Sequence, residues 1–283
     1  MNADHGKAFT AMAVSSVFFS LMSFCVKWAD GIPPLQIVFF RALIAGVLCL
    51  VQLRWMGINP FGTHRRLLLQ RGVFGSLALM AYFWSLSNLP LATASVLQSL
   101  SPLFTATLAW LFLGQSLPLR SVLWFAVAGA GVVVIQGTGA GGGLGPIAIA
   151  LSGAFFAACA YTTISRIGKR EHPLVIVFSF PLVTVPLVTP MLPSLWVWPN
   201  PTQWAALLGV GICVQIAQVA MTQAYQLGPA GPVSLVKYLG LVWAGLGGWL
   251  LFQEPLTLRL IGGAALIVLA VVGISRSKAS RAR

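Results

Sequence analysis

The sequence predicts an all-α polytopic membrane protein whose ten transmembrane helices form two inverted five-helix repeats around a central cavity. Composition indicates the membrane class. Of the 283 residues, 58% are hydrophobic and only 7% are charged, whereas charged residues make up about a quarter of soluble domains. The apolar runs are continuous and about 20 residues long, which suits membrane-spanning helices, and they lack the alternating pattern of barrel strands.

Polar and Gly/Pro-rich breaks divide the chain into ten apolar runs, each of which we expect to form one helix. The expected helices cover residues 8–28, 34–53, 69–88, 91–113, 119–137, 145–165, 173–192, 203–226, 229–252 and 257–275. The connections between them are too short to hold a soluble domain. The first residues lack a basic segment followed by a cleavage site, so we expect no cleaved signal peptide and a retained first helix.

An internal repeat divides the chain into residues 1–138 and 139–283, with a glycine-rich segment at the junction. Sliding the second half over the first by 138 residues aligns Leu89 with Leu227, Ala92 with Ala230, Leu97 with Leu235, Leu103 with Leu241 and Gln115 with Gln253. Because five spans is an odd number, the second copy must enter the membrane in the opposite orientation. Inverted repeats of this kind are typical of transporters.

The basic residues favour one side of the membrane. If the N-terminus is cytoplasmic, the cytoplasmic segments hold 13 of the 17 Lys and Arg residues, including Arg54, Arg65, Arg66 and Arg71 from the end of the second run to the start of the third. The positive-inside rule therefore predicts an inner-membrane protein with both termini in the cytoplasm. The net charge of +13 then reflects topology, and no nucleic-acid partner is expected.

Two basic residues lie well inside apolar runs. Arg41 is inside the second run and Lys237 inside the ninth, and neither has an acidic neighbour in sequence. A charge at the centre of a membrane helix costs roughly 2.5–3.5 kcal/mol, so such residues usually face a protein interior or a watery cavity. The repeat places Lys237 opposite Ser99 and Arg41 opposite Ser179. We therefore expect both cations to face a cavity between the halves.

Two segments and the ten-span plan point to a known family. Phe40-Arg-Ala-Leu-Ile-Ala in the second run and Phe252-Gln-Glu-Pro-Leu-Thr before the tenth resemble the EamA-type branch of the drug/metabolite transporter superfamily. The resemblance covers essentially the whole chain. It implies a central cavity lined mainly by the first four helices of each half, with the fifth and tenth helices at the periphery. The first half departs from the family's usual Gly-Glu pair, with Gly114-Gln115-Ser116.

Polar and aromatic side chains follow the helices that are expected to line the cavity. The candidate substrate-binding residues are Lys237, Arg41, Tyr82, Trp84, Gln98, Ser99, Tyr161, Gln215, Gln218 and Tyr238. The candidate hinges are Pro102, Pro181, Pro186, Pro229 and Pro232. Of these, Pro181 and Pro186 are expected to interrupt the seventh run. The alternatives are that the polar groups only bond neighbouring helices and that the prolines only produce static kinks.

The scarcity of acids indicates the substrate class. The acidic residues, none of them deep inside a run, are Asp4, Asp30, Glu171 and Glu254. An antiporter of lipophilic cations would be expected to carry an intramembrane carboxylate, whereas buried positive charge suits a carboxylate or a phosphate. We therefore predict an exporter of amino acids, with aromatic ones as a candidate subset, or of related small metabolites by alternating access. The alternative is a transporter of an anionic metabolite, an organic acid or a sugar phosphate, that Lys237 and Arg41 bind.

Other function classes have little support in the sequence. The cysteines and histidines are dispersed, so we expect no metal site and no bound cofactor. A membrane-embedded enzyme is a remote alternative, because there is no intramembrane acid to orient a base and no GxSxG, HExxH or phosphate-loop motif. The expected partners are a small-molecule solute and the lipid bilayer, and a homodimer stays open.

Overall fold

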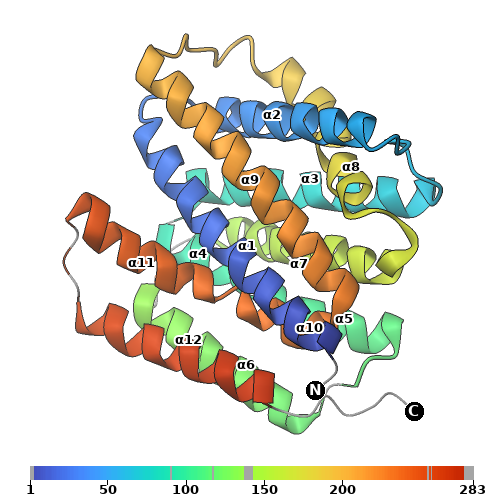
Figure 1. Ribbon diagram of the computed structural model, residues 1–283. Helices are drawn as coiled ribbons and strands as arrows, with labels where there is room; N and C mark the ends of the chain where they lie inside the picture. The colour runs from blue at the N-terminus through green and yellow to red at the C-terminus, as the bar shows by residue number, and fades with distance from the viewer. Residues whose placement is uncertain are drawn as a thin grey trace.

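The computed structural model describes residues 3–89, 91–116, 118–136, 143–253, 255 and 257–276. In these residues every expected apolar run is a helix or a pair of helices (Figure 1). The first half contains α1 (Ala3–Trp28), α2 (Pro34–Trp55), α3 (Arg65–Asn88), α4 (Leu91–Gln98), α5 (Ser101–Leu113) and α6 (Leu119–Gln136). The second half contains α7 (Leu144–Ile167), α8 (Pro173–Val188), α9 (Pro201–Leu227), α10 (Ala230–Val236), α11 (Leu239–Phe252) and α12 (Leu258–Arg276). Short 3-10 helices follow α7 and α8, at Gly168–Arg170 and Thr189–Met191.

The described helices account for ten spans. Nine segments, with α4 joined to α5 and α10 joined to α11, are long and apolar enough to cross a membrane, and α6 supplies a shorter apolar helix over Leu119–Ile135. The all-α, ten-helix architecture predicted from the sequence is thereby confirmed. The predicted boundary between residues 138 and 139 lies outside the described residues and stays a prediction.

Local sequence explains where several helices begin. Proline is the first residue of α2, α8 and α9, a position where its fixed φ fits and its missing N–H is not needed. Asn200 also caps α9: its side chain accepts a hydrogen bond of 2.8 Å from the backbone N of Gln203, whose Oε1 accepts one of 2.8 Å from the backbone N of Asn200. This reciprocal capping satisfies two backbone donors at the start of α9.

Two helices break at the same position of the repeat. α4 gives way to α5 at residues 99–100, and α10 gives way to α11 at residues 237–238. The two breaks differ by the same 138 positions that align the halves in sequence. The fourth span of each half is therefore a discontinuous helix, of the kind that lines substrate sites in transporters.

The prolines of α8 do not interrupt it, so that expectation was wrong. α8 is continuous, with Pro181 and Pro186 inside it, and Pro190 lies in the following 3-10 helix. Membrane helices tolerate proline where neighbouring groups compensate for the lost backbone bond. Gly46 of α2 lies close to Pro181 of α8: a Cβ added to Gly46 would be 3.1 Å from Cβ of Pro181. Pro181 therefore lies in a close helix contact within a continuous helix.

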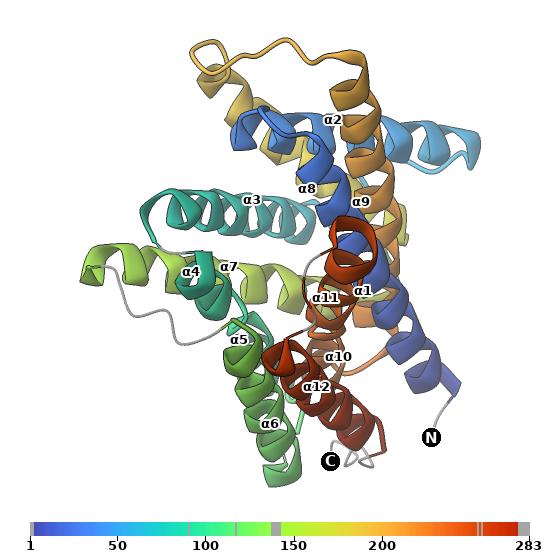
Figure 2. The same ribbon diagram turned by 90° about the vertical axis from the view of Figure 1, so that its left-hand side faces the viewer.

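The two halves interleave. α1 packs mainly against α9 and α11, α2 against α8 and α9, and α3 against α7 and α8. α6 and α12 pack against each other at one edge of the molecule (Figures 1 and 2). Helices from both halves consequently meet at the centre, while the fifth span of each half lies at the periphery.

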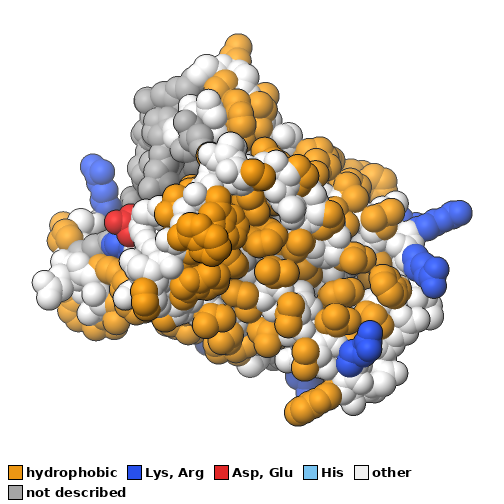
Figure 3. Space-filling view, turned by 90° about the horizontal axis from the view of Figure 1, so that it is seen from above, with side chains coloured by type: hydrophobic (Ala, Val, Ile, Leu, Met, Phe, Trp, Pro, Cys, Tyr) orange, Lys and Arg blue, Asp and Glu red, His pale blue; other side chains and the backbone are white. Residues whose placement is uncertain are grey.

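Much of the surface is apolar, as contact with lipid requires. Trp55, Phe112 and Leu119 are 91%, 71% and 74% exposed. Figure 3 shows hydrophobic side chains across most of one face, with Lys and Arg near its margins. Apolar patches of this extent are rare on soluble monomers. The chain is therefore a multi-pass membrane protein, and its inner-membrane location and cytoplasmic termini stay predictions.

Candidate functional site

A cavity of about 90 Å³ lies where the two halves meet. Its walls come from α2, α3 and α4 of the first half and from α7, α8 and α9 of the second. The lining residues are Arg41, Arg71, Gly75, Ala78, Leu79, Tyr82, Gln98, Ala157, Ala160, Tyr161, Phe180 and Gln218. Arginine, tyrosine and glutamine side chains thus gather at one point among otherwise apolar helices.

Arg71 is buried in the wall of this cavity, with 2% of its surface exposed. Its Nη2 donates a hydrogen bond of 3.2 Å to Oε1 of Gln218, and its guanidinium carbon lies 5.6 Å from the centre of the Phe180 ring. Its Nε has no hydrogen-bond partner among the described residues. Counting Arg71 with the cytoplasmic loop was wrong: α3 begins at Arg65, so Arg71 lies about two turns inside the helix.

The face of α3 that lines the cavity carries a signal that could have identified Arg71. Arg71, Gly75, Ala78 and Tyr82 follow at helical intervals, so they share one face, and all four line the cavity. A Cβ on Gly75 would collide with Nη1 of Arg71 and lie 2.9 Å from Cδ2 of Phe180. The glycine therefore leaves the space that the guanidinium group occupies.

Arg41 lines the same cavity from α2. Its side chain is half-buried, and its Nε is buried without a partner in the described part of the chain. None of the described residues that line the cavity is acidic. The described part of the site therefore holds two guanidinium groups and no carboxylate that would neutralise them.

The described carboxylates lie elsewhere. Asp4, in the first turn of α1, forms an ion pair of 3.0 Å with Lys169. Asp30 follows the end of α1, Glu171 precedes α8, and Glu254 lies outside the described residues. Among the described residues, no group of three His, Cys, Asp or Glu side chains could hold a metal ion. Positive charge at the cavity is thus the main electrostatic feature of the site.

Glu171 joins two loops at one end of the molecule. Its Oε1 accepts hydrogen bonds from N and Oγ1 of Thr63, at 2.7 and 2.6 Å, and from N of His64, at 2.6 Å. Burial raises the pKa of a carboxyl, but these hydrogen bonds outweigh burial and lower the pKa of Glu171 to about 2. Nε2 of Gln226 donates to the backbone O of Gly168 and of Glu171, at 2.7 and 2.9 Å. The α2–α3 loop, the α7–α8 loop and α9 are thereby tied together.

Lys237 lies at the break between α10 and α11 and contacts Tyr161, one of the residues of the cavity wall. Its Nζ is 4.0 Å from the centre of the Tyr161 ring, and Tyr161 lines the cavity. Tyr161 also stacks on Tyr225, with ring centres 5.2 Å apart and an interplanar angle of 14°. Lys237 is not itself among the lining residues. Its ammonium group therefore contacts a side chain of the cavity wall, the Tyr161 ring, without lining the cavity itself.

The structure gathers part of the candidate set at the cavity. The members that line it are Arg41, Tyr82, Gln98, Tyr161 and Gln218. The members that do not line it are Lys237, Trp84, Ser99, Gln215 and Tyr238. Trp84, for example, is 42% exposed. Oε1 of Gln98 is buried without a partner among the described residues, so it is a free acceptor beside the arginines.

Several of the other candidates connect helices. The hydroxyl of Tyr238 donates to the backbone O of Ser99, so the break residues of the two halves bond each other. The backbone O of the candidate hinge Pro102 accepts a hydrogen bond of 3.2 Å from Oγ of Ser234 in α10. Nε2 of Gln215 lies 3.0 Å from Sγ of Cys49 and joins α9 to α2. These bonds hold the frame around the cavity.

The candidate hinge prolines lie at helix starts or inside α8. Pro102 is in the first turn of α5, next to the first break. Pro229 is the N-cap of α10 and Pro232 lies early in the same helix, at its end away from the second break. A hinge role for these residues and for Pro181 and Pro186 stays a prediction.

Comparison with known proteins identifies the family. The EamA-like transporter family matches residues 6–137 and again residues 144–276. The chain belongs to this family. The repeated match fits two inverted five-helix repeats, and it confirms the resemblance to the drug/metabolite transporter superfamily. The protein is therefore a transporter of small molecules in a membrane, and not an enzyme.

Similar proteins span nearly the whole chain. The pseudopaline exporter CntI of Pseudomonas aeruginosa is 34% identical over 98% of this chain and 99% of its own. The mouse solute carrier family 35 member G1 is 26% identical over 92% of this chain and 76% of its own. A riboflavin transporter of Vibrio cholerae is 25% identical over 96% of this chain and 94% of its own. A solved crystal structure has a TM-score of 0.86 at 21% identity, over 97% of this chain and 98% of that one, and supports the fold.

Proposed function

We propose that this transporter exports a small metabolite that carries more than one carboxylate, and that Arg41 and Arg71 bind those carboxylates. The observation that carries the proposal is the pair of cavity-lining guanidinium groups whose Nε atoms have no partner among the described residues. An uncompensated buried charge costs several kcal/mol, and the planar guanidinium fork suits bidentate binding of a carboxylate. An anionic substrate would supply the missing partners.

The sequence predicts export of amino acids, with aromatic ones as a candidate subset, or of related small metabolites, and within that prediction amino acids with a neutral side chain have less support from the geometry. A neutral amino acid brings one carboxylate and one ammonium group, and no acidic residue lines the described cavity to receive the ammonium. The aromatic faces nearby already hold protein cations, because Tyr161 faces Lys237 and Phe180 faces Arg71. An organic acid, or an amino acid derivative with additional carboxylates, matches the charge better.

The small cavity supports alternating access as the mechanism. Pockets for small molecules usually measure about 300–1,000 Å³, whereas this cavity measures about 90 Å³. A metabolite therefore requires the two halves to move apart on one side before it binds. Broken fourth helices that meet at the repeat interface are the elements that such movement uses in other transporters.

The proposed direction and orientation rest on separate observations. The relatives at 34% identity are named as exporters, which favours export here. The distribution of basic residues favours an inner-membrane location with both termini in the cytoplasm.

Flux measurements in proteoliposomes test the substrate class. The panel contains radiolabelled tricarboxylate, dicarboxylate, glutamate and phenylalanine, with the variants Arg41→Gln and Arg71→Gln. We expect flux of the di- and tricarboxylates, and a decrease of roughly 10- to 100-fold in either variant, as the loss of a charged hydrogen bond predicts. Arg65→Gln, an exposed arginine at the start of α3, should transport like the wild type.

Two results would contradict the proposal. Phenylalanine flux that survives both substitutions would restore the neutral amino-acid hypothesis. Flux of a sugar phosphate, but of no carboxylate, that both substitutions abolish would show that the arginines bind phosphate.

A further inference from the structure

We propose that the groove between α6 and α12 binds an anionic phospholipid, with an acyl chain along its apolar wall and the headgroup phosphate between Arg120 and Arg276. This site is separate from the central cavity and does not depend on the proposed substrate. Its ligand chemistry is a phosphodiester with net negative charge attached to an apolar chain.

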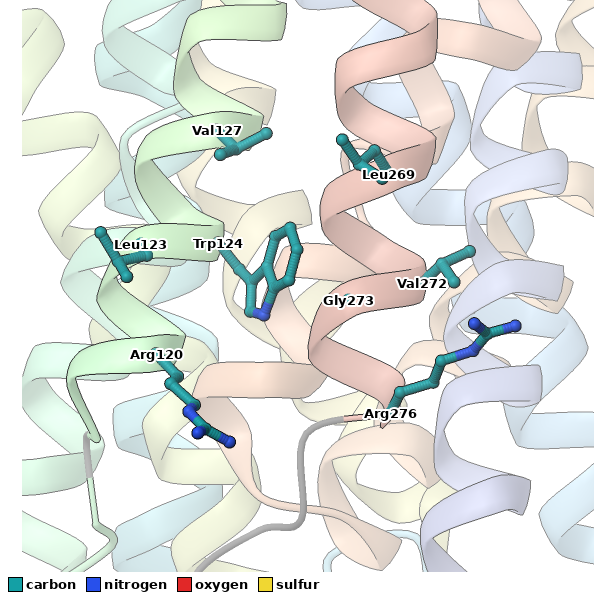
Figure 4. A pocket seen from close by; sticks show the side chains of 8 residues that line it. All are labelled: Arg120, Leu123, Trp124, Val127, Leu269, Val272, Gly273 and Arg276. Carbon is teal, nitrogen blue, oxygen red and sulfur yellow. The ribbon is translucent and has the colours of Figure 1, made fainter.

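The groove is larger than the central cavity and faces outward. Its volume is about 600 Å³. Leu123 of α6 and Leu269 of α12 are 57% and 54% exposed on its walls. Figure 4 shows the Trp124 side chain between the two helices, with Arg120 and Arg276 at one end. An apolar trough on the periphery of a membrane protein is in contact with lipid chains.

Glycine determines the shape of the trough. A Cβ on Gly273 would collide with the ring of Trp124, so the indole packs directly against the backbone of α12. A larger residue at position 273 would push the indole outward into the groove. The concave wall therefore depends on the pair of Trp124 and Gly273.

The two arginines give the groove a charged end. Arg120 is in the first turn of α6 and Arg276 is the last residue of α12, so the helices bring both side chains to the same end. Both are exposed, none of the residues that line the groove is acidic, and the described residues contain no ion pair of either arginine. The N-terminus of α6 adds partial positive charge and the C-terminus of α12 adds partial negative charge at the same end, so the net positive charge comes from the two arginines. This end of the groove therefore attracts an anionic headgroup.

An anionic lipid fits both parts of the groove better than the other available occupants. A small polar solute would leave the apolar wall without a partner. A second copy that docks symmetrically would bring its own α6 and α12, and thus two more arginines and no acid from these lining residues. Basic residues beside the end of a membrane helix attract anionic headgroups. The apolar wall and the two arginines together therefore favour a lipid as the occupant, and they favour an anionic lipid over a zwitterionic one.

Native mass spectrometry of the purified full-length protein tests the site. The protein is titrated in detergent with phosphatidylglycerol and, separately, with phosphatidylcholine of the same acyl chains. We expect tighter binding of phosphatidylglycerol, and a decrease in its affinity of roughly 30-fold in the double variant Arg120→Gln/Arg276→Gln. The control Arg65→Gln/Arg66→Gln removes two exposed arginines from the start of α3 and should bind like the wild type. Leu269→Trp, which fills the wall and keeps both charges, should also weaken binding.

The outcomes that overturn the proposal are specific. Equal binding of the two lipids, or equal loss in the Arg65/Arg66 control, would show diffuse attraction to the basic surface. A dimer that persists after delipidation and is lost in Leu269→Trp would assign the groove to a second copy. Because the readout is lipid affinity, failure here leaves the proposed transport function untouched, and loss of flux in the cavity variants leaves this site untouched.

Discussion

At the scale of single residues, the two arginines of the central cavity are expected to lower the stability of the fold and to bind the substrate. Arg41 and Arg71 line it without an acidic partner among the lining residues, and Nε of each is buried and unbonded in the described structure. Unpaired buried cations destabilise a fold, so their presence is best explained by a ligand that pairs with them. This predicts that the arginines contribute to transport and detract from stability.

Arg71→Met tests this trade directly. Methionine keeps much of the side-chain volume and removes the charge, so we expect the thermal midpoint of the substrate-free protein to rise, by an amount that corresponds to about 1 kcal/mol. Transport should be lost in the same variant. Scanning calorimetry or fluorescence in detergent measures the midpoint. A lower midpoint together with lost transport would show that Arg71 holds the fold.

Gly75 is predicted to set the position of Arg71. A methyl group here meets Nη1 of Arg71 and the Phe180 ring, so Gly75→Ala should displace the guanidinium group and raise the KM for transport several-fold. The matched control is Gly129→Ala, because a Cβ on Gly129 of α6 meets nothing within 4 Å. Concentration-dependent flux separates the two parameters. An unchanged KM in Gly75→Ala would show that Arg71 tolerates the shift.

Glu171 predicts a pH dependence of stability. Its pKa falls from 4.5 to about 2 in the folded protein, so its contribution is fully present above pH 4.5 and is lost as the pH falls through about 2. The contribution is at most roughly 3 kcal/mol by linkage. Thermal midpoints measured from neutral pH to about pH 3 should fall less in Glu171→Gln than in the wild type. Asp30→Asn, at an exposed carboxyl after α1, should follow the wild type, and an identical acid response in all three proteins would contradict the assignment.

At the scale of helices, the repeat carried more information than the individual motifs. The offset of 138 that pairs Lys237 with Ser99 in sequence places both at helix breaks, at residues 237–238 and 99–100. The ten spans could also be predicted, because continuous apolar runs of about 20 residues have few alternatives in a membrane. Repetition and hydrophobic length are properties of the chain that need no tertiary contacts.

The site was harder to predict because it depends on which face of each helix turns inward. Arg71 was counted with Arg65 and Arg66 among the cytoplasmic basic residues, yet these two begin the helix that buries it. Gln215 and Gln218 are neighbours on α9, but only Gln218 lines the cavity, while Gln215 bonds Cys49. One-turn differences of this kind are decided by packing, which a single sequence does not display.

The bond between the two breaks predicts a separation of binding from movement. Tyr238→Phe removes the hydroxyl that bonds the backbone O of Ser99, and Tyr238 does not line the cavity. We expect the maximal flux to change several-fold with little change in KM, because a hydrogen bond of about 1 kcal/mol between moving elements is lost. Tyr225→Phe is the control, since its hydroxyl has no partner among the described residues. A rise in KM without a change in maximal flux would place Tyr238 at the substrate.

At the scale of the whole molecule, bonds between the halves tie both ends of the bundle. At one end Glu171 bonds Thr63 and His64. At the other end Gln36 exchanges two hydrogen bonds with the backbone of Val197, at 2.7 and 3.0 Å. The first tie joins the α7–α8 loop to the α2–α3 loop, and the second joins α2 to the segment before α9. With both ends tied the cavity stays small, so access requires one tie to open while the other holds.

The two ties are therefore predicted to have opposite effects on access. A reporter cysteine replaces Ala160, which lines the cavity, after the four native cysteines are replaced, and an impermeant thiol reagent is applied from one side of oriented vesicles. Gln36→Leu should speed labelling from the side that carries the Val197 tie, and Glu171→Gln should speed it from the opposite side. Gln36→Leu loses both bonds to Val197, and Glu171→Gln weakens the bonds to Thr63 and His64 by removing the charge of their acceptor. Effects of about 1–3 kcal/mol would shift a two-state population by roughly 5- to 150-fold. If both variants speed labelling from the same side, the two ends do not act as alternating gates, because each tie would then favour the same open conformation.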